Sequence, residues 1–324
     1  MATHQSSICV VLEDSSGGGE HLETRLKMLA DQSTLAGECW IQTSQQGTER
    51  VRNLLRSKKW PWPITIVEVE DNRLAQARNK AIEETHCQWI IFWQENFMWQ
   101  PHTLEAMTTD SHRDSPVMVF SNVELKGAGH TPQPTLFEHW PGFRRFFNHS
   151  PWRPISLKGS AFQSLLGEPV CCGSAVLYAV EMLKRSGGIS ENLPTEAQLW
   201  DACLRLSLQG IVSATPYPWV SWQQSGTDST LPYIRACEAI HERYAVQLAR
   251  LPMLMKRRAK ARLAQAYSHF YLALKCPGQA IAHLLRASYQ LPERRTWQGW
   301  HAAFSHLWQQ LLPPRYSGGQ HTPA

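Results

Sequence analysis

The chain has 324 residues, more than most single domains, and 43% of them are hydrophobic while 18% are charged. This composition is typical of a globular protein and excludes a disordered or fibrous chain. No run of 18 apolar residues occurs, so we expect no membrane-spanning helix. The first ten residues lack a basic segment followed by an apolar one, so we expect no secretory signal.

The formal net charge of +5 is unevenly distributed along the chain. From residue 250 onward, eleven Lys or Arg residues stand against a single acidic residue, Glu293. The densest part of this basic tail, KRRAKAR from Lys256 to Arg262, predicts either a solvated helix face or a contact with a membrane surface or a protein. No nucleic-acid-binding motif accompanies it and residues 1–249 are net negative, so nucleic acid is not an expected partner.

The eight cysteines form no CxxC pair, and the fourteen histidines form no cluster with zinc spacing. Several of the cysteines lie inside apolar runs, where a free thiol behaves as a small hydrophobic side chain. The pattern favours a reducing compartment, so we expect a cytoplasmic protein, with peripheral attachment at the inner membrane face as an extension of that expectation.

Short apolar runs alternate with amphipathic stretches in the first half of the chain. We expect strands at residues 8–12, 38–43, 63–69 and 89–93, and helices at 22–32, 47–57 and 73–86. This alternation predicts the α/β class, with a mostly parallel sheet flanked by helices. Because ligands bind beyond the carboxyl ends of parallel strands, we expect the functional site in the loops after Leu12, Thr43 and Trp93.

The second half is less regular. Residues 126–168 are rich in Pro, Gly, His and aromatic residues, which predicts an irregular insertion that acts as a lid or as a packing loop. A strand, two helices and another strand follow, and a helical hairpin at residues 256–290 loosely matches one tetratricopeptide unit. We expect a main domain at 1–232, a helical extension at 233–312 and a flexible tail at 313–324.

Two segments carry a resemblance to a known family. One is LAQARNKAIEETHCQWIIFWQENFMWQPHTLEAM at residues 74–107, and the other is GSAVLYAVEMLKRSGGISENL at 173–193, followed by LWDACLRL. In this order they resemble the family 2 glycosyltransferases, and the helical tail is similar to tails on many bacterial members. The resemblance implies a GT-A (Rossmann-like) fold and transfer of a sugar from a nucleotide sugar to a saccharide or lipid-linked acceptor, as in cell-surface polysaccharides.

The resemblance also implies where the site lies. The nucleotide-sugar-binding positions that it indicates are Glu13, Asp14, Arg78, Asn79, Gln94, Glu95 and Asn96. The family's acidic metal-binding turn reads Gln94-Glu95-Asn96 here, which leaves Glu95 as its one carboxylate. We expect either a Mn²⁺ or Mg²⁺ ion held by Glu95 or a site that needs no metal. Arg78 either supplies positive charge to the leaving diphosphate or ties its helix to a strand.

The family's catalytic base also departs from its pattern. Its Glu-Asp pair aligns with Gln198 and Leu199, and leucine cannot accept a proton from an acceptor hydroxyl. The nearest carboxylates, Glu196 and Asp201, are therefore the candidate catalytic residues. The nucleotide-binding aspartate expected after the second strand is replaced by Thr43 or Ser44.

Two functional hypotheses follow from these departures. The first is an active glycosyltransferase, and the second is a catalytically degenerate relative that serves as a binding or scaffold module through its basic hairpin. The fourteen tryptophans add a local question, because Trp93 and Trp99 flank the altered turn. Their indole rings either shape a sugar pocket or pack in the core.

Overall fold

The structure is a computed structural model that describes residues 7–14, 20–70, 73–111, 114–126, 135–139, 153–157, 159, 161–167, 173–223, 230–292, 296–297, 299–301 and 303–305. The chain divides into two compact units. The first unit comprises Met1–Gly226 and Arg235–Leu251, and the second comprises Thr227–Ile234 and Pro252–Ala324. The expected boundary at residue 232 falls inside helix α10 (Thr230–Arg243).

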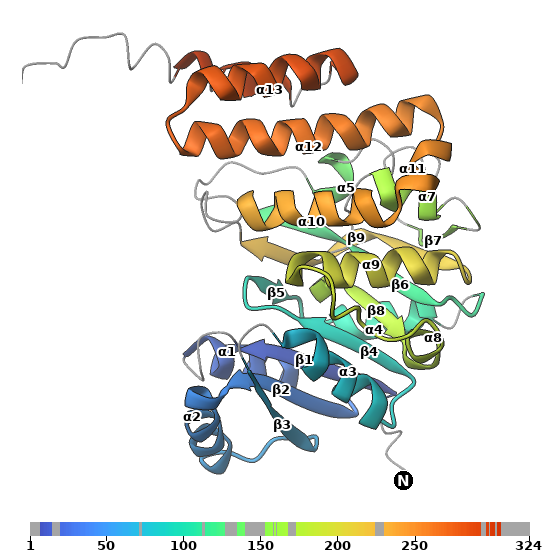
Figure 1. Cartoon of the computed structure of the whole chain (residues 1–324). Coiled ribbons are helices and arrows are strands. Elements are labelled where there is room, and N and C mark those ends of the chain that lie inside the picture. The colour runs from blue at the N-terminus through green and yellow to red at the C-terminus, as the bar shows by residue number, and fades with distance from the viewer. Residues whose placement is uncertain are drawn as a thin grey trace, which may run out of the picture. The chain divides into compact units, whose positions relative to one another are not determined.

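The first unit is built on one nine-stranded sheet (Figure 1). Its strands are β1 (Ile8–Asp14), β2 (Glu38–Ser44), β3 (Ile64–Val69), β4 (Trp89–Trp93), β5 (Phe97–Trp99), β6 (Met118–Lys126), β7 (Ile155–Leu157), β8 (Val176–Ala179) and β9 (Val212–Gln223). The strand order is β3-β2-β1-β4-β8-β6-β9-β5, and β7 pairs with β9. The first four strands are mutually parallel, and β8 joins them to the second half of the sheet in antiparallel pairing.

Helices connect and cover these strands. In the first unit they are α1 (Glu20–Ala30), α2 (Gln45–Arg56), α3 (Leu74–Glu84), α4 (Thr103–Ser111), α5 (Leu136–His139), α7 (Ala161–Gly167), α8 (Val180–Arg185), α9 (Thr195–Ser207), α11 (Ala245–Arg250) and the part of α10 from Arg235 onward. Helices α2 and α3 pack on β2 and β3, while α4 packs on β6 and β9. This arrangement confirms the predicted α/β fold class.

The parallel half of the sheet forms where the sequence predicts it. Every residue of β1 and of β4 is buried, as expected for strands covered on both faces. Helix α1 turns Leu22, Leu26 and Leu29 toward the core, and none of these three side chains is exposed. The carboxyl ends of β1, β2 and β4 therefore come together at one edge of the sheet, next to the loops in which the site is expected.

Strand β6 is not predicted from the sequence, and it lies near the centre of the second half of the sheet. Within the expected insertion at 126–168, the structure describes helices α5 and α7 and strand β7. The rest of that segment, from 127 to 134 and from 140 to 152, lies outside the described residues, as do 313–324 of the expected tail. The predicted lid therefore stays a prediction.

The second unit contains the predicted helical hairpin, α12 (Met253–Ala273) and α13 (Pro277–Gln290). Its buried core includes Leu272 and Leu284, against which Trp300 packs. The basic stretch from Lys256 to Arg262 lies on α12, but Arg262 is buried and donates a hydrogen bond to Gln265 Oε1 (2.9 Å). A uniformly solvated basic face is therefore excluded. Contact with a membrane or a protein through this stretch stays a prediction.

Within the part of the chain that the structure describes, we find no helix of sufficient length and apolar character to cross a membrane.

Candidate functional site

A cavity of about 500 Å³ opens at the carboxyl ends of β1, β2, β3 and β4. Its lining residues come from these strand ends and from the turns that follow them: Glu13, Asp14, Gln42, Thr43, Ser44, Val69, Glu70, Leu74, Gln94, Glu95 and Asn96. Five of the nine predicted site residues thus line one cavity, namely Glu13, Asp14, Gln94, Glu95 and Asn96. Of the other four, Arg78 and Asn79 lie on α3, and Glu196 and Asp201 lie on α9.

The altered turn, Gln94 to Asn96, is held firmly by its neighbours. The Gln94 amide donates to Ser174 Oγ (2.7 Å), and the Asn96 carbonyl accepts from the amide of Gln223 on β9 (2.9 Å). These contacts fix the backbone of the turn from both sides of β4. The side chains of Gln94, Glu95 and Asn96 are therefore presented to the cavity on a rigid support.

The two tryptophans that flank this turn pack in the core. The rings of Trp93 and Trp99 are stacked, with centroids 3.8 Å apart and planes 9° from parallel, and both side chains are buried. Each indole N–H also has a partner, since Trp93 donates to the Phe97 carbonyl (2.9 Å) and Trp99 to the Ser174 carbonyl (3.0 Å). The core interpretation of these residues is confirmed, and the stacked pair supports the turn from below.

The adjacent ends of β1 and β2 are joined by a polar pair. Asp14 and Thr43 are partners in the strand register, and the Thr43 hydroxyl donates to Asp14 Oδ2 (3.0 Å). Thr43 or Ser44 stands where the resemblance expects a nucleotide-binding aspartate, so the end of β2 offers hydroxyl groups beside the carboxylate of Asp14. Asp14 and Thr43 both line the cavity, and their side chains are buried in the pair that they form with each other.

Arg25 on α1 is a component of the site that the sequence analysis missed. Its side chain is 1% exposed, and its Nη1 donates to the carbonyls of Glu13 (2.8 Å) and Trp93 (3.2 Å). Its Nη2 lies 4.0 Å from Asp14 Oδ1 and 3.8 Å from Glu95 Oε1. Burial lowers the pKa of Arg25, and the neighbouring carboxylates of Glu95 and Asp14 oppose that shift.

Arg78 on α3 is fully buried and links three elements. Its Nε and Nη2 contact Glu13 Oε1 at 2.8 and 2.6 Å, and its Nη1 donates to Gln198 Oε1 on α9 (2.8 Å). The guanidinium also lies over the Phe92 ring, 5.8 Å from its centroid. This geometry supports the second of the two expectations, in which Arg78 ties its helix to the sheet.

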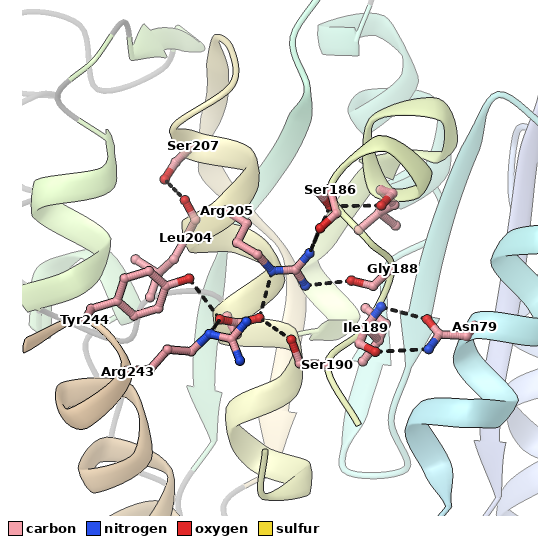
Figure 2. Close-up of polar contacts among 12 residues, drawn as sticks. Asn79, Ser186, Gly188, Ile189, Ser190, Leu204, Arg205, Ser207, Arg243 and Tyr244 are labelled. Carbon is pink, nitrogen blue, oxygen red and sulfur yellow. Dashed lines mark hydrogen bonds and ion pairs between the residues drawn. The ribbon is translucent and has the colours of Figure 1, made fainter. Parts of the chain in front are cut away.

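Asn79 holds a loop rather than the cavity wall. Its amide makes both of its hydrogen bonds with the backbone of Ile189, donating to the carbonyl (3.0 Å) and accepting from the N–H (2.6 Å) (Figure 2). The preceding residue, Gly188, has φ +67°, and a Cβ there would stand 2.6 Å from Asn79 Oδ1. The close approach of Asn79 to this loop therefore depends on a glycine.

Gly188→Ala is expected to lower the free energy of unfolding by about 2–4 kcal/mol, because the added methyl strains a left-handed backbone and displaces Asn79. Gly187 provides a matched control, since its φ is +89° and no atom lies within 4 Å of an added Cβ. Gly187→Ala should cost only about 1 kcal/mol. Urea unfolding of both variants measures the difference, and equal losses would contradict the role of Asn79.

The two candidate bases on α9 have different surroundings. Glu196 is exposed in the first turn of the helix, where it can meet an acceptor. Asp201 is completely buried, and its carboxylate accepts hydrogen bonds from Ser190 Oγ (2.8 Å), Arg205 Nε (2.8 Å) and Tyr244 Oη (2.8 Å) and forms an ion pair with Arg243 Nε (3.0 Å). Figure 2 shows these four partners, which come from the loop before α9 (Ser190), from α9 itself (Arg205), and from the last residue of α10 and the residue after it (Arg243 and Tyr244).

A catalytic base must reach a hydroxyl of the acceptor, and the surroundings of Asp201 leave it no solvent access. The carboxylate instead fastens α9 to the loop before it and to α10. Burial raises the pKa of Tyr244, and the charge of Asp201 raises it further, so the phenol stays protonated and keeps donating. Its geometry is that of a structural anchor, whereas Glu196 keeps the accessibility that a base needs.

Leu199 occupies the place where the resemblance expects the base. Its side chain is buried, and a Cβ on Gly173 would stand 2.3 Å from Leu199 Cδ1 and 3.6 Å from Gln94 Oε1. The base position and the altered metal-binding turn therefore lie on the two sides of Gly173. The Leu199 and Gln94 side chains that approach Gly173 are both uncharged.

The residues present do not fit a divalent metal. Two of the three side chains in the turn are amides, which supply no negative charge. Among the described residues, no group of three or more His, Cys, Asp or Glu side chains is arranged to hold a metal ion. The two nearest carboxylates, Asp14 and Glu95, already have the guanidinium of Arg25 within 4.0 Å.

By sequence, the chain matches no model of a known family and no curated protein. Its fold is similar to that of solved glycosyltransferases. A mannosyltransferase, PcManGT from Pyrobaculum calidifontis in complex with GDP-Man and Mn²⁺, has a TM-score of 0.56 and 16% identity, with coverage of 95% of this chain and 89% of that one. S. aureus TarS 1-349 in complex with UDP-GlcNAc has a TM-score of 0.52 and 12% identity, with coverage of 88% and 92%. At these identities the likeness establishes the fold.

Proposed function

We propose that this chain is a glycosyltransferase that binds a nucleoside diphosphate sugar in the cavity and transfers the sugar to a saccharide or lipid-linked acceptor. The observation that carries the proposal is the position of the cavity, at the carboxyl ends of four parallel strands. Open α/β sheets bind their ligands at such an edge. A cytoplasmic location, with attachment to the inner membrane face for lipid-linked acceptors, belongs to the same proposal.

The cavity has features that suit a nucleoside diphosphate. Helix α2 begins directly after Ser44 and helix α3 begins at Leu74, and both of these residues line the cavity. The first turns of the two helices contain no acidic residue, so the partial positive charge of their amides is not cancelled locally. Helix N-termini of this kind bind phosphate groups, while Asp14 and Thr43 offer hydrogen bonds to the nucleoside.

Solved structures of the same fold support the choice of ligand. PcManGT is in complex with GDP-Man, and TarS 1-349 is in complex with UDP-GlcNAc. Nucleotide sugars are therefore the ligand class that we carry over to this chain. The proposal does not choose between the sugars or between the nucleotide bases of these two ligands.

Glu196 is the residue that we propose as the general base. It lies in the first turn of α9, three residues before Leu199, and its side chain is exposed. A carboxylate in this place can take the proton from an acceptor hydroxyl as the hydroxyl attacks the sugar. Asp201, a buried residue of the same helix, keeps α9 in position through its polar contacts.

One observation favours a second candidate function. Leu199, at the expected base position, is buried next to the altered turn, so the base position carries no charge and the turn keeps only the carboxylate of Glu95. A chain with these two changes can keep its nucleotide site and lose transfer. In this alternative the protein is a binding or scaffold module that responds to nucleotide sugar.

Calorimetric titration with UDP, GDP and their sugars, in EDTA and in Mn²⁺, tests the proposal. We expect one of the two nucleoside diphosphates to bind. When acceptor is added to the corresponding nucleotide sugar, we expect sugar transfer to release that diphosphate slowly. Glu196→Gln should lower the release rate about 10²- to 10⁴-fold and leave binding unchanged. Glu191→Gln is the matched control, because Glu191 is exposed just before the same helix. Binding without release would favour the second function, and no binding in either condition would contradict both.

A further inference from the structure

Arg25 is an unusual residue for a helix that covers a sheet. Its guanidinium is 1% exposed, and one of its two terminal nitrogens is saturated by the carbonyls of Glu13 and Trp93. These carbonyls belong to the ends of β1 and β4, so Arg25 bridges the two strands whose ends line the cavity. A buried charge is costly unless it is paired, so its other nitrogen must meet negative charge.

The second terminal nitrogen, Nη2, lies between two carboxylates of the cavity wall. It is 4.0 Å from Asp14 Oδ1 and 3.8 Å from Glu95 Oε1, and within the described structure it donates no hydrogen bond. The Asp14 side chain is fully buried, whereas that of Glu95 is 27% exposed and faces the cavity. Arg25 therefore lies behind this wall, with its Nη2 between the carboxylates of Asp14 and Glu95.

Arginines pair with each of the carboxylates in the cavity wall. Four carboxylates line it, those of Glu13, Asp14, Glu70 and Glu95. Arg78 pairs with Glu13, Arg73 with Glu70, and Arg25 with both Asp14 and Glu95. These arginines offset negative charge in the wall, where the carboxylates by themselves would repel a diphosphate.

We propose that Arg25 is the resident cation of this cavity, and that by neutralising Asp14 and Glu95 it allows a nucleoside diphosphate to bind without a divalent metal. A divalent ion at the altered turn would need these same two carboxylates as ligands, and it would stand close to the buried guanidinium. The two remaining side chains of the turn, Gln94 and Asn96, are neutral amides. This inference rests on the proposed function for the identity of the ligand, and Arg25 acts in it as a positioning residue.

Titration with Mn²⁺ alone, followed by electron paramagnetic resonance of the free ion, tests the role of Arg25 without any nucleotide. We expect the wild-type cavity to take up no Mn²⁺. Arg25→Met takes the guanidinium away from Asp14 and Glu95, so this variant should take up a Mn²⁺ ion, and the double variant Arg25→Met/Glu95→Gln should lose it again. Uptake by the wild-type protein that disappears in Glu95→Gln would overturn the proposal. If the wild-type protein takes up Mn²⁺ and Glu95→Gln takes up the same amount, the ion binds outside the cavity, and this result agrees with the proposal.

Arg25→Met also removes two hydrogen bonds to backbone carbonyls and can prevent folding, so a second measurement uses the wild-type protein only. The affinity for UDP or GDP is expected to change less than about twofold between EDTA and Mn²⁺. A loss of more than about tenfold in EDTA would overturn the inference while leaving the proposed function intact. If no nucleotide binds in either condition, the proposed function fails, and the Mn²⁺ titration of the wild-type protein still decides the role of Arg25.

Discussion

Asp201→Asn is expected to lower the free energy of unfolding by about 3–5 kcal/mol, although the side chain hardly changes its shape. Asp201 has four polar partners, two of which are arginines, and it is completely buried. In asparagine one carboxylate oxygen is replaced by an NH₂ group. That NH₂ group then faces the N–H or O–H donors that the oxygen had bound, and no hydrogen bond can form between them. Urea unfolding of the purified chain, extrapolated to water, measures the loss.

Glu196→Gln is the control for this experiment, because it removes a carboxylate from the same helix at an exposed position. Its effect on stability should stay below about 0.5 kcal/mol. The two variants also separate a structural role from a catalytic one. If Asp201→Asn keeps its stability and loses sugar transfer, Asp201 is the base after all and the structural interpretation is wrong.

Arg78→Met is expected to cost about 3–5 kcal/mol of the free energy of unfolding. Methionine keeps an apolar stem of similar length, but Glu13 then loses the cation that contacts it at 2.6 Å, and Gln198 loses a donor. The variant leaves a carboxylate in the wall of the cavity with less compensation. Thermal and urea unfolding should therefore show a large loss, with a weaker affinity for nucleotide as a second effect.

Arg73→Met is the matched control for Arg78→Met, because Arg73 lies just before the same helix and pairs with an exposed Glu70. Its cost should be below about 1 kcal/mol. The double variant Arg78→Met/Glu13→Gln removes both charges and should recover part of the lost stability. A stable Arg78→Met protein that no longer binds nucleotide would instead place Arg78 in direct contact with the diphosphate.

Much of the parallel half of the sheet could be predicted because its signals are local. Strands β1 and β4 contain continuous apolar runs, β2 has a shorter one at its centre, and amphipathic helices separate them. Strand β6 gives no such signal, since Ser121 and Asn122 interrupt it. These two residues are satisfied by distant partners: Ser121 Oγ donates to the Tyr217 carbonyl and the Asn122 amide to the Pro216 carbonyl. A prediction from the local pattern of polar and apolar residues cannot detect partners that lie so far away in the sequence.

The candidate site was predictable to the same extent. Glu13, Asp14 and the turn after β4 line one cavity because the strands that carry them are parallel neighbours. Arg25 was missed because a charged helix residue is usually expected to face solvent. One signal was available, since Arg25 lies three residues after Leu22 and four before Leu29, on the stripe that the helix buries. Asp201 gave no comparable signal, because Arg243 and Tyr244 lie far along the chain.

The cluster around Asp201 also has a consequence for synthesis on the ribosome. Asp201 and Tyr244 are 43 residues apart, a length that takes roughly 2–9 s to translate at about 5–20 residues per second. During this interval helix α9 has been made, while Arg243 and Tyr244 have not yet been added. A nascent chain that pauses before residue 243 therefore carries an incomplete first unit, which proteases and chaperones can recognise until the last two donors arrive.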